Sequence, residues 1–471
     1  MARLGRSGLF LTPQSLLCRL GVAALLGAAV AFAGGHPSVL ILLFALVSAL
    51  SVLALGWGAL IGLTVGATFV TRFRFSVAGT HFMLEHFLLV ACVLVLVARG
   101  QVAALIDAAR HRAVVLFGGY VVWSAFISVV RAPSPAKSLP IVGWLGLDWL
   151  LVVVIVVAAA NDPQGFVRKG ARWLGPTAGV AVGLWVAANV FHTTFGVQTD
   201  LEYRGLLAAY GLSWEANVLA STLAVWVFLG LTDLEARTPR SQRVALGVAF
   251  LAILLSLTRA GILALGAGFG AWAVLGGQVA RRRVATMALV AAVGVLGFFF
   301  FIPRLAHPVA ARASTLLDFR SGTGQYRATV AAIAIGDLHG LAWVTGLGTN
   351  SFGQRHLDPS LVDKPTPGYL GILPLQVVYD SGLVGAVLLG AAVLTLIPKN
   401  PRRAARSVGV LVVYVACGSA TSPLWFGFTW ILFGVAVAAR RQRGAAGENS
   451  HNDLLPLAAR ASRHLSRSSA G

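Results

Sequence analysis

Leu257-Thr258-Arg259-Ala260-Gly261 joins two apolar stretches, one from Val244 to Ser256 and the other from Ile262 to Val279. Only Thr258 adds polarity beside the arginine, so there is almost no loop that would carry this charge into bulk water. An unpaired arginine at membrane depth costs roughly 2.5–3.5 kcal/mol on insertion scales. A charge kept at that cost usually faces a cavity or an anionic partner. Arg259 therefore predicts a pair of membrane helices with a functional site at their junction.

The composition excludes a soluble protein. Of the 471 residues, 57% are hydrophobic and 11% are charged, and the mean hydropathy is +0.81. Soluble domains carry roughly 25% charged residues, so the chain is predicted to be a polytopic membrane protein. The formal net charge of +21 lies mostly in short Arg and Lys clusters between apolar runs, as the positive-inside bias requires. No nucleic-acid partner is therefore expected.

The fold class predicted from the apolar runs is all-α, a polytopic bundle of 12 to 14 transmembrane helices with one long outer loop that contains short helices. About 20 apolar residues span a bilayer as a helix. The predicted spans are about 20–35, 38–55, 57–71, 82–98, 113–130, 138–160, 173–195, 215–232, 244–257, 260–279, 284–302, 369–397, 407–421 and 423–439. The count is a range because 38–71 forms either two spans or one hairpin.

Basic clusters after every second span predict the orientation. They are Arg99/Arg110/Arg112, Arg168/Lys169/Arg172, Arg237/Arg240/Arg243, Arg281/Arg282/Arg283, Lys399/Arg402/Arg403/Arg406 and Arg440/Arg441/Arg443. All six clusters and both termini are predicted to lie on the cytoplasmic side. The predicted location of the protein is the plasma (inner) membrane. Arg72/Arg74 and Arg131/Lys137 are exceptions to this pattern.

Four regions follow from this topology. They are N-terminal transmembrane helices at 1–195, a core at 196–397 that includes the outer loop 303–368, C-terminal transmembrane helices at 398–443, and a disordered cytoplasmic tail at 444–471. A connection as long as 303–368 is usually functional. Within it, small apolar residues recur at helical spacing from Tyr326 to Leu338, which predicts a helix lying across the outer mouth of the bundle.

Three arginines on the predicted outer face form the candidate binding site. Arg204, Arg259 and Arg327 run against the positive-inside bias. Each guanidinium offers five fixed donors that match phosphate oxygens bidentately. If the three meet at the outer lipid boundary, they form a site for the diphosphate of a lipid-linked sugar. For each arginine alone, the competing interpretation is that its head simply reaches the lipid headgroups.

The surroundings of these arginines resemble the O-antigen ligase and polymerase family of bacterial membrane glycosyltransferases. Thr258-Arg259-Ala260-Gly261-Ile262-Leu263 resembles the family's "SR(S/G)G-x-L", and Arg204-Gly205 followed by Trp214-Glu215-Ala216-Asn217 resembles "R-x-x-G … N-x-x-A". Arg327 with Gly346-Leu347-Gly348-Thr349-Asn350-Ser351-Phe352 resembles "R … P-L-x-G-x-G-x-x-x-F", and Gln376 to Gly385 is similar to "L-Q-x-x-x-E-x-G-x-x-G". The resemblance covers about 200–390.

The resemblance implies transfer of a glycan from a polyprenyl-diphosphate carrier to a glycan or glycolipid acceptor at the outer face of the membrane. It also implies that Arg204, Arg259 and Arg327 hold the departing diphosphate while the acceptor hydroxyl attacks the anomeric carbon.

Signatures of cofactor binding do not occur in the sequence. There is no DxD, HExxH or Walker motif, so the prediction includes no metal, ATP or other cofactor. Gly346-Leu347-Gly348 lacks the strand and the third glycine of a dinucleotide site. Its glycines are instead expected to let the backbone approach the ligand or neighbouring helices closely.

One departure from the family pattern concerns the acceptor side. The family usually has a histidine about eleven residues before the glycine aligned with Gly382, where this chain has Gly371. His356, with an imidazole suited to proton transfer, and Asp380 are the predicted catalytic residues. Glu202, Asn217 and His339 are the supporting candidates. Glu202 either orients Arg204 or is merely solvated. Asn217 either acts in the site or, with Glu215, satisfies the free N–H groups of a helix start.

The sequence leaves two other interpretations open. A flippase for lipid-linked oligosaccharides, or another transporter, would favour broken spans, internal repeats and charges along a continuous path. Glu85 and Asp148, ionisable residues inside spans, fit either that path or polar pairing within the bundle. A catalytically silent relative would explain the missing histidine. The sugar, the acceptor, and the choice between single transfer and polymerisation are not determined by the sequence.

Overall fold

The computed structural model describes most of the predicted helical region. The described residues are 57–72, 74–77, 80–193, 202–203, 206–233, 239–301, 323–356, 370–419 and 421–442. The predicted spans 20–35 and 38–55 and the tail at 444–471 lie outside the described residues, so the total number of spans stays a prediction.

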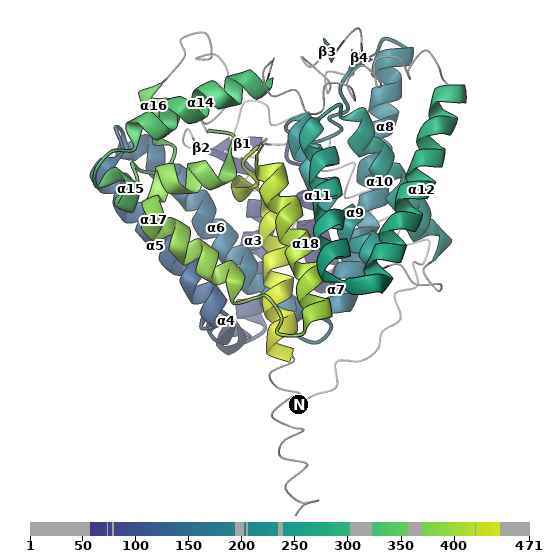
Figure 1. Ribbon diagram of the computed structural model, residues 1–471. Coiled ribbons are helices and arrows are strands. Elements are labelled where there is room, and N and C mark those ends of the chain that lie inside the picture. The colour runs from purple at the N-terminus through teal and green to yellow at the C-terminus, as the bar shows by residue number, and fades with distance from the viewer. Residues whose placement is uncertain are drawn as a thin grey trace, which may run out of the picture.

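Helices make up nearly all of the described chain (Figure 1). In chain order they are Trp57–Ala67, α3 (Leu84–Ala98), α4 (Val102–Ala109), α5 (Arg112–Arg131), α6 (Pro135–Ala159), α7 (Pro163–Gly170), η1 (Ala171–Trp173), α8 (Leu174–Val190), α9 (Ala216–Thr232), α10 (Arg240–Leu255), α11 (Arg259–Leu275), α12 (Gly277–Phe301), α14 (Thr323–Asp337), α15 (Ala342–Thr345), α16 (Ser351–Arg355), α17 (Leu373–Leu394), α18 (Pro401–Gly418), η3 (Pro423–Trp425) and a last helix at 427–442. Two short antiparallel hairpins join them, β1 (Arg74–Val77) with β2 (Thr80–Met83) and β3 (Glu202–Tyr203) with β4 (Leu206–Leu207).

The predicted helical membrane bundle is confirmed. Helices α5, α6, Pro163–Val190 and α17 are long and apolar enough to cross a membrane, and several further apolar helices are shorter. Within a bilayer the backbone donors and acceptors must be satisfied inside the segment, which an apolar helix does. Helix α14 confirms the helix predicted from Tyr326 to Leu338.

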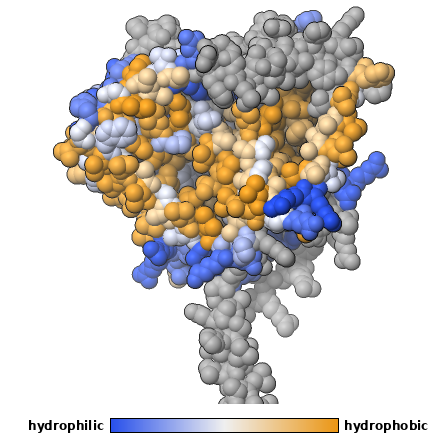
Figure 2. Space-filling view, in the orientation of Figure 1, coloured by the Kyte–Doolittle hydropathy of each residue, from blue (hydrophilic) through white to orange (hydrophobic). Residues whose placement is uncertain are grey.

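The two ends of the bundle differ. Helices α4 and α7 lie at the lower end in Figure 1, whereas α14 and all four strands lie at the upper end. At the lower end Arg441 pairs with Asp107 of α4, and Arg406 pairs with Asp233 at the end of α9. On the face shown in Figure 2, apolar residues cover the middle of the molecule, and hydrophilic residues gather below them. Among the described residues, the basic cluster in α7 and the residues Arg406 and Arg441 of two other clusters thus lie at one end, as the alternation predicts.

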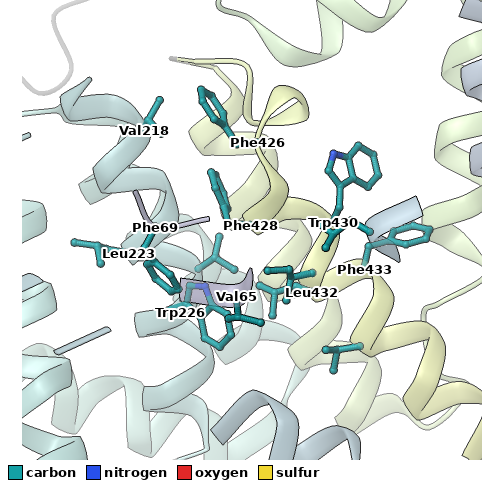
Figure 3. Packing of buried hydrophobic residues seen from close by; sticks show 14 of the residues in the cluster. Val65, Phe69, Val218, Leu223, Trp226, Phe426, Phe428, Trp430, Leu432 and Phe433 are labelled. Carbon is teal, nitrogen blue, oxygen red and sulfur yellow. The ribbon is translucent and has the colours of Figure 1, made fainter. Parts of the chain in front are cut away.

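Aromatic packing around the last helix forms the centre of the bundle. In Figure 3, Phe428 of this helix lies near Phe69 and near Trp226 of α9, whereas Trp430 lies on the other side, toward Phe433. Trp430 stacks on Phe117 of α5 with ring centroids 4.0 Å apart. Because lipid is as apolar as these side chains, their close van der Waals packing, rather than removal from water, holds the helices together.

Helix α17 is broken at Gly382, and a turn from another part of the chain fills the break. Gly382 has φ 64, within a helix otherwise continuous from Leu373 to Leu394. The Leu347 N–H donates to the Tyr379 carbonyl at 2.8 Å, and the Gly348 N–H donates to the Asp380 carbonyl at 3.0 Å. The break would otherwise leave backbone acceptors without donors, which is costly in a membrane protein interior.

The close approach at this break requires glycine on both sides. A Cβ at Gly346 would lie 2.6 Å from the Asp380 carbonyl oxygen, and a Cβ at Gly382 would overlap the Val344 carbonyl. Both residues also have positive φ, at 84° and 64°. The prediction that the glycines of 346–348 permit close backbone approach to a neighbouring helix is therefore confirmed.

Gly382→Ala is expected to undock the 346–348 turn from α17. The left-handed dihedral alone costs about 1–3 kcal/mol for a residue with a side chain, and the overlap with Val344 adds to it. The thermal unfolding midpoint in detergent should fall clearly. Gly390→Ala is the matched control in the same helix, because a Cβ added there would meet no neighbouring atom within 4 Å. Equal midpoints for the two variants would contradict this account of the break.

Candidate active site at the upper end

Arg259 is the first residue of α11, and only three residues separate it from the end of α10. The tight link is possible because Leu257 has φ 54 and because the hydroxyls of Ser256 and Thr258 lie 3.0 Å apart. Arg259 itself is half-buried. The prediction that almost no loop carries this arginine is confirmed.

The junction lies at the upper end of the bundle. The Ala209 N–H, two residues after β4, donates to the Leu255 carbonyl at 2.9 Å. Arg259 thus combines a fixed positive charge with the N-terminal end of a helix, where unpaired backbone N–H groups and the helix dipole favour an anion. An anionic group bound here would meet both.

Helix α14 brings Arg327 to the same end. It lies across the upper end in Figure 1. Val330, Ala334 and Leu338 pack with Phe352 and Tyr379 in a hydrophobic cluster separate from the main core. Arg327, on the preceding turn, is half-buried. Packing on α17 and α16, rather than its own weak amphipathicity, therefore fixes the position of α14.

Arg204 lies outside the described residues, so the meeting of the three arginines stays a prediction. Glu202 is in β3, where it is paired with Leu207 of β4. Asn217 is half-buried in the first turn of α9. Its neighbour Glu215 makes no side-chain cap of that helix and instead accepts a hydrogen bond from the Thr421 hydroxyl at 3.1 Å. The interpretation of Glu215 as a helix cap is therefore wrong.

His356 forms a three-residue polar cluster with two residues from other elements. Its Nε2 lies 2.7 Å from Oδ2 of Asp337, the last residue of α14. The Tyr379 hydroxyl of α17 donates to the same oxygen at 2.5 Å. The exposed fractions of His356 and Asp337 are 32% and 25%, so the cluster opens to the surface. A carboxylate that orients an imidazole in this way is the usual arrangement of a general base.

The Asp337 carboxyl is held in its charged form. Partial burial raises its pKa, but the hydrogen bonds from Tyr379 and His356 and the positive charge of Arg355 outweigh that effect, and the net shift is below the ordinary value of 3.8. Hydrogen bonds to the ionised form favour that form. Asp337 therefore stays a carboxylate near neutral pH.

Two further arginines lie around this cluster. Arg355 donates to the Arg131 carbonyl at 3.2 Å, and Arg131 donates to the Thr345 hydroxyl at 2.5 Å. Arg131 is one of the exceptions to the positive-inside pattern. These contacts connect the end of α5 to α15 and α16, so Arg131 belongs to the upper-end site.

Asp380 is placed differently from His356. Its side chain is only 3% exposed. One carboxyl oxygen accepts from the Gln376 side-chain amide at 3.3 Å, and the backbone N–H of Asn350 also bonds to the carboxyl group. This position, behind the 346–351 turn, suits a residue that holds the turn. Of the other predicted residues, His339 is exposed in the turn after α14.

Gly371 occupies the position at which the resemblance expects a histidine. Its φ is 64, a conformation that residues with side chains rarely adopt. An imidazole at this position would strain the backbone just before α17. His356, which directly follows α16, shares the Asp337 carboxyl with Tyr379 of α17.

Glu85 and Asp148 form a second polar region within the bundle. They are buried on α3 and α6. Neither takes part in the ion pairs found among the described residues. Their place on the N-terminal helices separates them in sequence from the upper-end site.

Comparison with known proteins identifies the segment that contains this site. Residues 244–390 match the family profile described as O-antigen ligase. This segment is an O-antigen ligase domain. The match covers about a third of the 471 residues and includes Arg259, Arg327, His356 and Asp380, whereas Arg204 precedes it. No curated protein matches the chain. The resemblance predicted from the motifs is confirmed within the O-antigen ligase domain.

The lowered pKa of Asp337 predicts how the docking of α14 depends on pH. A carboxyl with a depressed folded-state pKa stabilises the fold above its ordinary value and loses that contribution as pH falls through the folded value. Hydrogen exchange of the α14 amides, corrected for intrinsic rates, should stay slow at about pH 5 and accelerate below the ordinary 3.8. Asp337→Asn should abolish this acid dependence, and Asp233→Asn, at the lower end, should keep it. Acceleration of equal size in Asp337→Asn would contradict the assignment.

Proposed function

We propose that this protein transfers a glycan from a polyprenyl-diphosphate carrier to a hydroxyl of a glycan or glycolipid acceptor. The single observation that carries the proposal is Arg259, half-buried at the first position of α11 in an O-antigen ligase domain, with no loop to carry it into water. A diphosphate at the lipid boundary is the chemical group that this position suits. The carrier supplies the activation energy in its phosphoester bond.

In the proposed reaction, arginines bind and stabilise the diphosphate leaving group. Negative charge develops on the diphosphate as the anomeric C–O bond breaks, and preorganised donors in a site of low dielectric stabilise that charge. Arg259 and Arg327, with Arg204 as a further predicted member, are the donors. An arginine does not lose its proton in proteins, so the clamp stays charged throughout the reaction.

His356 is the proposed base for the acceptor hydroxyl. It is partly exposed and oriented by Asp337, whereas Asp380 is buried and accepts hydrogen bonds from Gln376 and Asn350. We therefore assign Asp380 to support of the 346–351 turn rather than to contact with the substrate.

The proposed location is the plasma membrane, with the lower end in the cytoplasm. The basic clusters gather at the lower end, and Arg and Lys near membrane helices favour the cytoplasmic side. The upper end, with Arg259, α14 and His356, then faces outward. Lipid-linked glycans presented at the outer leaflet would reach the site from the bilayer.

The broken helix α17 is the feature that a transporter would share. In transporters such breaks expose backbone groups to a substrate path. Here the 346–348 turn occupies the break and satisfies the carbonyls of Tyr379 and Asp380. This packing supports an enzyme over a flippase. A flippase would move the carrier intact, so release of polyprenyl diphosphate separates the two functions.

Arg259→Ala should lower release of polyprenyl diphosphate from a polyprenyl-diphosphate glycan by about 10²–10³-fold, as loss of one transition-state donor does. Arg204→Ala should act likewise. Arg259→Lys keeps the charge but loses the bidentate fork, so its rate should lie between. Arg281→Ala, near the exposed start of α12, is the matched control. Full activity in both Arg259→Ala and Arg204→Ala would remove the proposed clamp.

A further inference from the structure

We propose that Asp337 and Tyr379 are positioning residues that hold His356 with its proton on Nε2, so that Nδ1 accepts the proton of the acceptor hydroxyl. The inference rests on the proposed function and specifies how its base is prepared. It names two residues that come from different helices and that no motif quoted for the family specifies.

The hydrogen bonds define the tautomer. Oδ2 of Asp337 lies 2.7 Å from Nε2 of His356 and 2.5 Å from the Tyr379 hydroxyl. A carboxylate only accepts, so both partners donate to it. In a neutral imidazole the second nitrogen is then an acceptor. Nδ1 is therefore the nitrogen left to take a proton.

Packing fixes the ring that these bonds orient. The Phe352 ring lies 4.9 Å from the His356 ring and 5.4 Å from the Tyr379 ring, measured between centroids. Asp337, His356 and Tyr379 come from α14, the end of α16 and α17, which are already packed in one hydrophobic cluster. The base is thus oriented before substrate binds, and little reorganisation is needed at the moment of reaction.

The proton and electron balance is that of a single group transfer. As the acceptor oxygen forms its bond to the anomeric carbon, its proton passes to Nδ1 of His356. The bond between the anomeric carbon and the diphosphate oxygen breaks, and the departing diphosphate keeps the electron pair. The imidazolium is stabilised by Asp337 and then releases its proton to water, since His356 is 32% exposed.

The position of Arg327 is compatible with this division of roles. Arg327 precedes Asp337 by ten positions on one helix, which corresponds to about 15 Å along the axis. A substrate bound between the two residues can bridge this separation. The arginine would hold the phosphate, the phosphate is linked to the sugar, and the acceptor at the sugar would hydrogen-bond to the base. The leaving group and the acceptor would thus bind at opposite ends of α14.

The charged and titratable groups around His356 come from each of the elements packed against it. Asp337 comes from α14, Tyr379 and Asp380 from α17, Arg355 from α16, and Arg131 from α5. Within the part of the chain that the structure describes, Asp337 and Tyr379 are the two connected to the imidazole through hydrogen bonds. Substitutions of Asp337 and of Tyr379 should therefore move the acid limb of the pH–rate profile in opposite directions.

The test is the pH–rate profile of polyprenyl diphosphate release. Asp337→Asn removes the negative charge that favours imidazolium, so the acid limb should move to lower pH, and kcat should fall roughly 10–100-fold, part of what a general base contributes. Tyr379→Phe removes a donor from the carboxylate and leaves more of its charge to the imidazole, so the acid limb should move to higher pH with a smaller loss of kcat. His356→Gln should lose both the rate and the acid limb.

A second measurement makes the inference independent of the rate. Nitrogen-15 NMR of the histidine-labelled full chain, with His356→Gln to assign the signal, should show the Nε2-protonated tautomer in the unsubstituted protein and a mixture in Asp337→Asn. Asp233→Asn, which removes a lower-end ion pair, is the control for both measurements.

The outcomes separate the two proposals. No release of polyprenyl diphosphate by the unsubstituted protein overturns the proposed function and this inference with it. Release by the unsubstituted protein, with the acid limbs of Asp337→Asn and Tyr379→Phe both unmoved and the tautomer unchanged, overturns the inference alone. Opposite shifts of the two limbs establish it.

Discussion

The upper end of this protein depends on the insertion of the 346–348 turn into the break of α17. Two backbone hydrogen bonds, to the carbonyls of Tyr379 and Asp380, hold it there. The carbonyls opened at Gly382 need donors because water is scarce in the interior of a membrane bundle. The same insertion sets the directions of α15 before the turn and α16 after it. His356, at the end of α16, therefore has its place decided by a helix break that it does not touch.

The polar residues beneath the turn act as supports in this arrangement. The Ser128 hydroxyl of α5 accepts from the Thr349 N–H at 2.9 Å, and the Ser381 hydroxyl lies 2.8 Å from that of Ser124. Trp123 donates to the Ser381 carbonyl at 2.7 Å. Helix α5, which precedes the O-antigen ligase domain in sequence, thus carries one wall of the site. The O-antigen ligase domain holds the residues of the candidate site, and contacts from α5, outside that domain, support them.

Much of the fold could be predicted from the sequence because membrane helices obey a local rule, a long run of apolar residues between polar ends. The loop-free Arg259 was predictable for the same reason, and the helix over 326–338 was predictable from the helical spacing of its small apolar residues. The His356 cluster was not, since its members are brought together only by the packing of α14, α16 and α17, and no motif specifies Asp337 or Tyr379. Arg131 stood out in the sequence because it is an exception to the positive-inside pattern. Its contacts with other elements could not be inferred from residue spacing. Burial of Asp380 likewise depended on a turn whose docking the sequence does not reveal.

In the proposed function, His356 provides the imidazole from a backbone position other than Gly371, where the resemblance places a histidine. A histidine just before α17 would require a conformation without the left-handed twist that Gly371 has. On α17, the Tyr379 hydroxyl donates to Asp337. The His356 imidazole, at the end of α16, contacts the same Asp337 carboxylate as the Tyr379 hydroxyl. The Phe352 ring packs against both the His356 and the Tyr379 rings. The proton transfer that we propose requires a fixed orientation of one ring nitrogen of His356, and the packing of α14, α16 and α17 can provide that orientation without a single motif position.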